Sequence, residues 1–247
     1  MASIDVTEPV DLDDPVLVEG LPGVGLVGKI ATDHLVEEYE MTEHAAVRCE
    51  GLPQVAVYDT DGRVQSPVRL YADAERDLLA LQSDVPVTRS AAASVADCLT
   101  DWLRDAGALP LYLSGLPVEQ DVDAIPATYG VSVGDGATAL QSADLDAPAQ
   151  RGVVSGPTGA LLAQASEDDL DAAGLVVESN PQFPDPAAAR QLLLKGVEPI
   201  AGIDVPTEAL VDRAEEIQDQ REELARRMQE AAEEESSQAQ SLGGMYR

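Results

Sequence analysis

The sequence has few basic residues: 15 lysines and arginines stand against 46 aspartates and glutamates in 247 residues, a formal net charge of −31. A surface this acidic repels the phosphates of nucleic acids and of anionic lipids, so we expect neither as a partner. The acidic residues are spread along the whole chain, which is typical of organisms that keep molar salt in the cytoplasm. At that salt concentration the Debye length is about 3 Å and self-repulsion is screened.

Aromatic residues, cysteines and long apolar runs are also scarce. Aromatics make up 3% of the chain, so the core must consist mainly of aliphatic side chains and alanine. No apolar run approaches the roughly 20 residues that span a bilayer, and the polar lead-in of residues 1–14 lacks a signal-peptide pattern. The two cysteines, Cys49 and Cys98, form no CxxC and no disulfide framework. We therefore expect a cytoplasmic protein in which both are reduced, small apolar residues.

A glycine-rich stretch follows the first apolar run of the chain. Residues 15–20 (Pro-Val-Leu-Val-Glu-Gly) lead into Gly23, Gly25 and Gly28, and a helical pattern continues to about Tyr39. This order predicts a strand, a tight turn and a helix, which is the first unit of an α/β sheet.

These three glycines match two phosphate-binding patterns. Their spacing is that of a dinucleotide fingerprint, and Glu50 lies where a ribose ligand would be expected. They also approach a P-loop with Lys29, but Ile30 stands where Ser or Thr must hold magnesium. The alternative is steric: Gly23 and Gly25 permit a sharp turn, and Gly28 lets the helix lie close to the sheet.

Apolar runs alternate with helical patterns over residues 15–205. This alternation predicts one α/β domain with a mainly parallel central sheet and helices on both faces. Within it, Asp61-Gly62 predicts a hairpin turn, and Arg151 to Val154 predicts a short strand. Asp185-Pro186 predicts the start of a helix that ends near Gly196.

No other constellation of reactive residues is apparent. His34 and His44 are not spaced as metal ligands with either cysteine, and no Gly-x-Ser-x-Gly elbow occurs. We therefore expect no metal, no cofactor and no catalytic residue, and hence a protein that is not an enzyme.

The C-terminal part has a different character. Residues 206–235 carry apolar or long side chains spaced alternately four and three apart, at Leu210, Ala214, Ile217, Arg221, Leu224, Met228 and Ala231. This pattern predicts an amphipathic helix that either packs on the body or self-associates. Residues 236–247 begin with the composition of a flexible linker.

The last three residues are Met245, Tyr246 and Arg247. A tyrosine offers contact area and a hydroxyl at little cost in conformational entropy, and a terminal carboxylate can be captured by a lysine or a backbone nest. On composition alone, however, a chance tyrosine in a disordered end would be the favoured interpretation.

Three stretches together resemble a known family. They are Leu17 with Gly20-Leu21-Pro22-Gly23-Val24-Gly25-Leu26-Val27-Gly28, then Gly159-Ala160-Leu161-Leu162, and finally Glu178-Ser179-Asn180-Pro181 followed by Pro184-Asp185-Pro186-Ala187-Ala188. Over about residues 10–205 the chain resembles the archaeal branch of the proteasome assembly chaperone family, and the acidic composition suggests a halophilic archaeon.

The resemblance implies a three-layer α/β/α sandwich without catalytic activity and a homo-oligomer, with a tetramer favoured. It also implies binding to α-subunits of the proteasome core particle through a C-terminal hydrophobic–Tyr–any motif. Met245 would fill the apolar slot of this motif, Tyr246 would pack and hydrogen-bond, and the carboxylate of Arg247 would pair with a lysine. The outcome would be help with proteasome assembly or ATP-independent opening of the gate.

Two further interpretations stay open. A nucleotide-binding enzyme, ATP-grasp-like or dinucleotide-dependent, would use the loop from Gly23 to Lys29. A structural partner would instead assemble with a related subunit, as in heteromeric chaperones.

Overall fold

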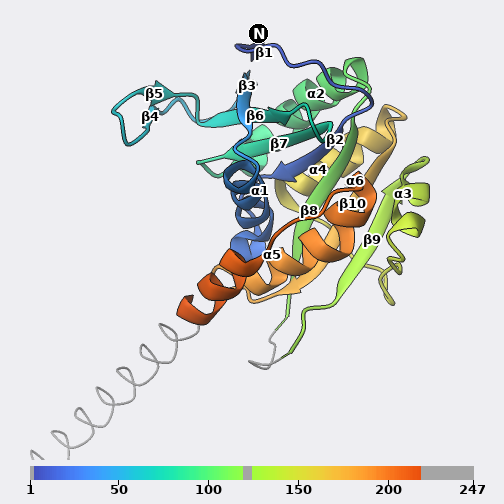
Figure 1. Ribbon diagram of the computed structural model, residues 1–247. Helices are drawn as coiled ribbons and strands as arrows, with labels where there is room; N and C mark the ends of the chain where they lie inside the picture. The colour runs from blue at the N-terminus through green and yellow to red at the C-terminus, as the bar shows by residue number, and fades with distance from the viewer. Residues whose placement is uncertain (1–2, 119–123, 218–247) are drawn as a thin grey trace, which may run out of the picture.

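The computed structural model describes residues 3–118 and 124–217, and its centre is a sheet of eight strands. Their order across the sheet is β1-β3-β6-β7-β2-β8-β10-β9 (Figure 1). The bounds are β1 Ser3–Val6, β2 Val16–Gly20, β3 Thr42–Arg48, β6 Val68–Asp73, β7 Leu78–Ser83, β8 Leu109–Pro117, β9 Thr128–Val133 and β10 Ala172–Ser179. A separate two-stranded hairpin consists of β4, Val57–Tyr58, and β5, Val64–Gln65.

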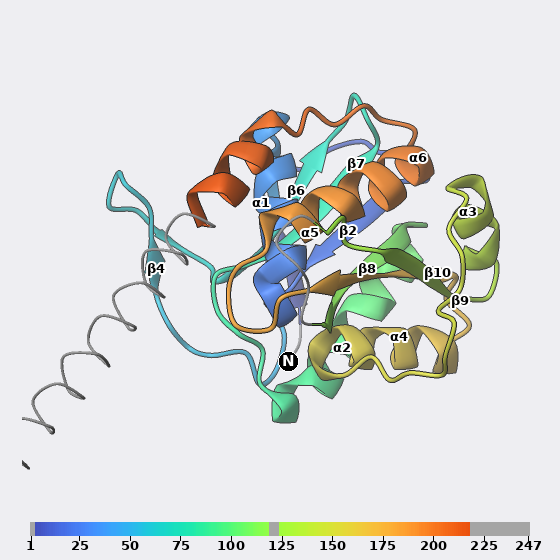
Figure 2. The ribbon, with the colours of Figure 1, turned by 90° about the horizontal axis from the view of Figure 1, so that it is seen from below.

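Helices cover both faces of the sheet, which confirms the predicted α/β/α architecture (Figure 2). One face carries α1 and α5, and the other carries α2 and α4. The bounds are α1 Val27–Glu38, α2 Arg89–Asp105, α3 Gly136–Ser142, α4 Gly156–Glu167, α5 Pro186–Leu192 and α6 Glu198–Ala201, with a 3₁₀ turn at Val24–Leu26 and a π-helical turn at Leu193–Val197. No helix in the described ranges is long and apolar enough to cross a membrane.

The sheet is parallel in its centre and antiparallel at its sides. Strand β2 pairs in parallel with β7 and β8, and β8 pairs in parallel with β10. These strands are buried from both faces, which explains their nearly continuous apolar sequences. Strands β1, β3 and β6 extend one side of the sheet, and β9 extends the other, all through antiparallel pairs.

Two segments at the sides of the sheet differ from the sequence expectation. The polar lead-in contains β1, which pairs with β3 from Ser3 to Val6. Residues 151–154, predicted as a strand, form a loop. The edge position beside β10 is taken by β9, so this segment has no ladder partner, and Val153 is 91% exposed.

The turn and the helix cap that were predicted from short local patterns are both present in the structure. The hairpin predicted at Asp61-Gly62 is present: Val57 pairs with Gln65 and Tyr58 with Val64, and Gly62 has a φ of 76°. Asp185 caps α5 as predicted, because its carboxylate accepts a hydrogen bond from the backbone N–H of Ala188 at 3.0 Å.

The predicted end of this helix at Gly196 is wrong. The chain continues through the π-helical turn and α6 to Ala201, and it ends where Gly202 adopts a φ of 67°. Gly196 is buried against Leu175 of β10, so its lack of a side chain permits close packing rather than a helix end. Pro199 has no N–H to donate, which favours the wider turn before it.

The C-terminal helix begins on the body of the protein. Residues 208–217 are helical, and Leu210 is fully buried in the same core cluster as α1 and α5. The guanidinium of Arg213 lies 3.9 Å from the carboxylate of Glu37 on α1. The first turns of the amphipathic helix therefore pack on the domain, while residues 218–247 lie outside the described residues.

The expectation of two reduced cysteines is also wrong. Cys49, just after β3, and Cys98, on α2, form a disulfide whose Cα atoms are 6.0 Å apart. The two positions are 49 residues apart in the chain, and only the packing of α2 beside the end of β3 brings them together. The sequence carries no local pattern that could have indicated this pair.

Candidate functional site

The glycine turn lies at the carboxyl end of β2 and leads into α1. Gly25 has a φ of 62°, and a Cβ there would clash with the hydroxyl of Ser179. A Cβ at Gly28 would lie 3.2 Å from the backbone oxygen of Glu19, so the missing side chain lets α1 lie close to β2. Gly23 is extended, with open space around its Cα.

A fully buried carboxyl group lies directly beneath this turn. Glu19 on β2 accepts a hydrogen bond from the backbone N–H of Leu21 at 2.9 Å and one from that of Leu113 on β8 at 3.2 Å. The hydroxyl of Thr158, at the start of α4, lies 3.2 Å from the same carboxyl group. Glu19 therefore ties the glycine turn to the neighbouring strand and to a helix on the opposite face.

Burial governs the ionisation of Glu19. Desolvation raises the pKa of its carboxyl group from 4.5 to about 8, and the hydrogen bonds from Leu21, Leu113 and Thr158 oppose that rise only in part. The Thr158 hydroxyl, which donates to this carboxyl group, also lies 3.5 Å from the Leu113 carbonyl oxygen. At neutral pH the Glu19 carboxyl group is therefore uncharged, and its hydrogen bonds hold the glycine turn, β8 and α4 together.

The far side of the turn is closed by the segment after β10. The Ser179 hydroxyl donates to a carboxylate oxygen of Asp185 at 3.1 Å, and the backbone N–H of Asn180 donates to the same oxygen at 2.9 Å. The backbone N–H of Asp185 donates to the carbonyl oxygen of Gly25 at 2.9 Å. The protein's own groups therefore fill the space beside Gly25 that a phosphate would otherwise approach.

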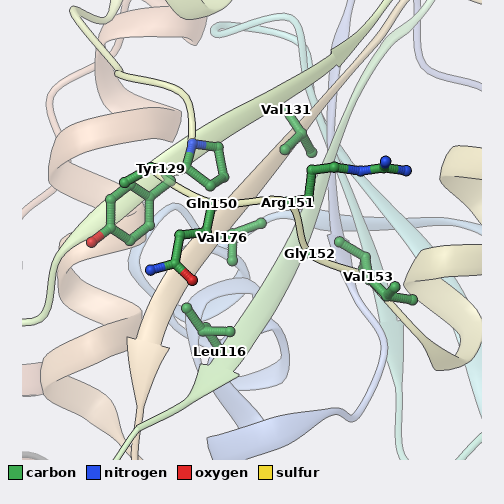
Figure 3. A pocket seen from close by; sticks show the side chains of 11 residues that line it. Leu116, Tyr129, Val131, Gln150, Arg151, Gly152, Val153 and Val176 are labelled. Carbon is green, nitrogen blue, oxygen red and sulfur yellow. The ribbon is translucent and has the colours of Figure 1, made fainter.

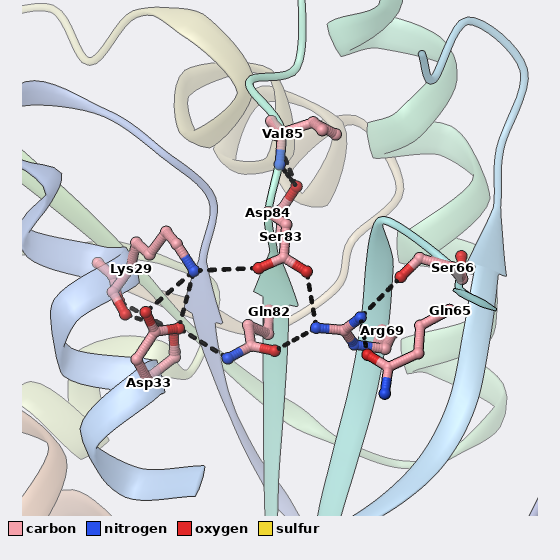
Figure 4. A network of polar contacts seen from close by, with 11 residues as sticks. Lys29, Asp33, Gln65, Ser66, Arg69, Gln82, Ser83, Asp84 and Val85 are labelled. Carbon is pink, nitrogen blue, oxygen red and sulfur yellow. Dashed lines mark hydrogen bonds and ion pairs between the residues drawn. The ribbon is translucent and has the colours of Figure 1, made fainter. Parts of the chain in front are cut away.

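Lys29, the residue at the P-loop lysine position, belongs to a polar network (Figure 4). Its ammonium group lies 2.9 Å from Asp33 and 3.5 Å from Asp84. Asp84 also pairs with the buried Arg69 of β6 at 2.7 Å, and Gln82 of β7 bridges Arg69 and Asp33. The two cations face two carboxylates, so the charge of Lys29 is already balanced.

The remaining sequence candidates do not converge on the turn. Glu50 follows β3, which is separated from β2 by β6 and β7, whereas a dinucleotide fold places its ribose ligand on the strand adjacent to the first. The ring of His34 on α1 contacts the Pro206 carbonyl oxygen at 2.6 Å, and that of His44 on β3 contacts the Glu8 carbonyl oxygen at 2.8 Å. Among the described residues no acid, histidine and cysteine cluster could hold a metal ion.

Met245, Tyr246 and Arg247, the predicted partner-binding residues, lie outside the described residues. Glu19 and Thr158 were not predicted from the sequence, although one signal for Glu19 was present. Glu19 is a single acid within the apolar run Pro15–Gly20, and an acid at that position requires either exposure or dedicated partners.

Solved structures with this architecture define the class of the fold. The chain matches PbaA of Pyrococcus furiosus, described as an archaeal homolog of proteasome-assembly chaperone, with a TM-score of 0.75 and 25% identity over 93% of this chain and 99% of that one. It matches PbaB of the same organism, described as an archaeal proteasome activator, with a TM-score of 0.74 and 23% identity over 91% and 98%. The likeness places the chain in the same class of α/β/α proteins.

The family follows from the sequence. The model of the PAC2 family matches residues 17–225, and the chain belongs to this family. An uncharacterized protein of Methanocaldococcus jannaschii is 24% identical over 222 residues, which cover 87% of this chain and 87% of the relative. The family match includes the glycine turn, Glu19 and the segment around Asp185.

Proposed function

We propose that the protein is a non-enzymatic proteasome assembly chaperone or ATP-independent activator that docks its C-terminal tail on the α-ring of the core particle. The general role is supported by membership of the PAC2 family and by the likeness to PbaA and PbaB. The observation that carries the docking mode is the sequence Met245-Tyr246-Arg247 at the end of a Gly-Gly-containing linker.

The chemistry of the tail suits a pocket between two subunits. Met245 supplies a flexible apolar side chain, and Tyr246 supplies a rigid ring with a hydroxyl. The carboxylate after Arg247 is an anion that a lysine of the pocket can pair with. Each tail alone binds weakly, and a homo-oligomer, for which we favour a tetramer, presents several tails and so raises their effective concentration.

A binding experiment tests the docking mode. Core particle from the same organism is captured on the immobilised full chain, and the chain lacking residues 245–247 is compared with it. Deletion should abolish capture, whereas Val6→Ser, a change of an exposed residue near the opposite end of the sequence, should leave it unchanged. Undiminished capture by the truncated chain would show that the tail is not the docking element.

The geometry of the glycine turn does not favour a nucleotide-binding enzyme as a second function. Lys29 is paired with two carboxylates, and the Ser179 side chain lies against Gly25. A thermal-shift measurement separates the two accounts: ATP and NAD should leave the melting temperature of the protein unchanged. A saturable rise that Gly25→Val removes would support the enzyme instead.

A further inference from the structure

The β4–β5 hairpin extends from the body as an arm, defined here as residues 55–65 (Figures 1 and 2). Tyr58 and Val64 are paired across its two strands and therefore share one face. Tyr58 is 76% exposed and Val64 is 72% exposed, and Val55 beside them is also exposed. In a chain with so few aromatic residues, the arm presents an apolar knob to solvent.

The base of the arm is fixed by polar contacts, several of them to the buried Arg69. Arg69, which is 5% exposed, donates to the side-chain oxygen of Gln65 at 2.7 Å and to the carbonyl oxygen of Ser66 at 3.0 Å. The Gln65 amide in turn donates to Asp59 at 3.1 Å, and Asp59 accepts the backbone N–H of Asp61 at 2.9 Å. The knob is thus held in a defined place before any partner arrives, which lowers the entropy lost on binding.

An apolar groove of about 400 Å³ lies at the other end of the sheet, on β8, β9 and β10 (Figure 3). Leu116, Val131 and Val176 line it from the strands, and the loop of residues 148–154 forms its wall. Figure 3 shows the ring of Tyr129 at one end of the groove and Val153 with Arg151 at the other. The Tyr129 hydroxyl donates to Glu178 at 3.2 Å, which orients the ring.

The charges of arm and groove are complementary. Arg151 at the groove is exposed and makes no ion pair with any residue that the structure describes. The tip of the arm carries Asp61 and Arg63, which are exposed as well, and together with Asp59 they give the arm a net charge of −1. In a chain of net charge −31, an exposed arginine at the edge of an apolar groove favours an occupant that brings an acid next to an apolar side chain.

We propose that the arm of one copy of this chain inserts Tyr58 and Val64 into the groove of a second copy, with Asp61 beside Arg151. Arm and groove lie at opposite ends of the sheet, so each copy offers one free arm and one free groove. The contact is therefore head-to-tail, and it generates a ring where the rotation between copies closes. This inference rests on the self-association in the proposed function, but not on tail docking.

Light scattering on the purified full chain in molar KCl tests the contact. The wild type should exceed the monomer mass of 26.0 kDa. The arm variant Tyr58→Ser/Val64→Ser and the groove variant Val153→Asp should each return to that mass with an unchanged circular dichroism spectrum. Val6→Ser removes an exposed valine of β1 outside both surfaces and should keep the wild-type mass.

Mixing the two variants provides a sharper test. The groove variant retains an intact arm and the arm variant retains an intact groove, so a head-to-tail contact predicts a 1:1 heterodimer and nothing larger. A contact between two identical surfaces predicts no complex in the mixture, and that result would overturn the proposal.

The remaining outcomes are distinguishable. Variants that keep the wild-type mass would overturn the arm–groove contact while leaving self-association intact. A monomeric wild type would contradict both the arm–groove contact and self-association, although the capture of core particle by the tail could still succeed. If Val153→Asp dissociates the oligomer and the arm variant does not, the groove holds a different segment, such as the C-terminal residues, and the proposal fails.

Discussion

At the residue scale, the fully buried carboxyl group of Glu19 links the glycine turn, β8 and α4. Burial raises its pKa to about 8, because the ionised form would lose its hydration without gaining a cation. The Glu19 carboxyl group beside the glycine turn is therefore neutral at acid and neutral pH.

The pH dependence of stability follows from this pKa. Between pH 4.5 and about 8 the folded state binds the Glu19 proton more strongly than the unfolded state, so this group's contribution falls as pH rises and levels off above about 8. Urea unfolding of the wild type and of Glu19→Gln, at constant KCl, isolates the effect. Relative to the wild type, the glutamine variant should gain on the order of a few kcal/mol from pH 5 to pH 8. Glu50→Gln, at an exposed acid, serves as the control, and parallel curves for all three proteins would contradict the account.

The glycines of the turn should differ in their sensitivity to a methyl group. Gly25→Ala meets Ser179 at a positive φ and should lower the free energy of unfolding by about 2–4 kcal/mol. Gly23→Ala, in extended backbone with open space, should change it by less than about 1 kcal/mol. Urea titrations compare the two variants, and equal sensitivity would argue against the steric role of Gly25.

At the element scale, signals that reside within a few residues gave correct predictions. Asp61-Gly62 indicated the arm hairpin, and Asp185-Pro186 indicated the start of α5. Predictions that depended on neighbours in space were less successful. Residues 151–154 remain a loop because β9 occupies the edge beside β10. The helical run that begins with α5 continues past Gly196 through the π-helical turn and α6, and Gly196 packs against Leu175 instead of ending the run.

The candidate site shows the same difference between features predicted from local spacing and features that depend on distant parts of the chain. The position of the glycine turn between strand and helix followed from spacing alone. Its partners Leu113, Thr158 and Ser179 come from three other regions of the chain, and only the order of the strands brings them to Glu19 and Gly25. The tail residues could be named from the sequence, and their docking remains a proposal.

The disulfide between Cys49 and Cys98 ties the end of β3 to α2 across a 49-residue separation. Closing a loop of this size stabilises a folded protein by about 2–4 kcal/mol. The variant Cys49→Ala/Cys98→Ala should lose that amount in urea unfolding, and the reduced wild type should lose a similar amount. Thiol titration of the unreduced protein provides the control, because two reactive thiols in the native state would contradict the pairing.

At the scale of the whole molecule, the excess of acid determines the conditions under which the protein stays compact. A net charge of −31 on a chain of 26.0 kDa implies strong self-repulsion in dilute salt. The melting temperature followed by circular dichroism should rise substantially between low and molar KCl. An unchanged melting curve would argue against the halophilic origin expected from the acidic composition.

The proposed arm–groove contact and the proposed docking of the tail are connected through the oligomer. An arm and groove that assemble copies head-to-tail would place several tails on one particle, and avidity would then compensate for the weakness of each tail. The acidic bodies would remain in solution while the tails enter the α-ring. Catalysis by the protein itself has no part in this account.

The peptidase activity of the core particle from the same organism measures the central claim most directly. Added wild-type protein should raise the hydrolysis of a short fluorogenic peptide without ATP if the protein opens the gate, and an excess of Tyr246→Ala should not. For a protein that only docks, the same pair is compared by its ability to compete with an established activator for the α-ring. The account predicts that Tyr246→Ala loses the effect in whichever assay the wild type shows one. A Tyr246→Ala variant as effective as the wild type would contradict it.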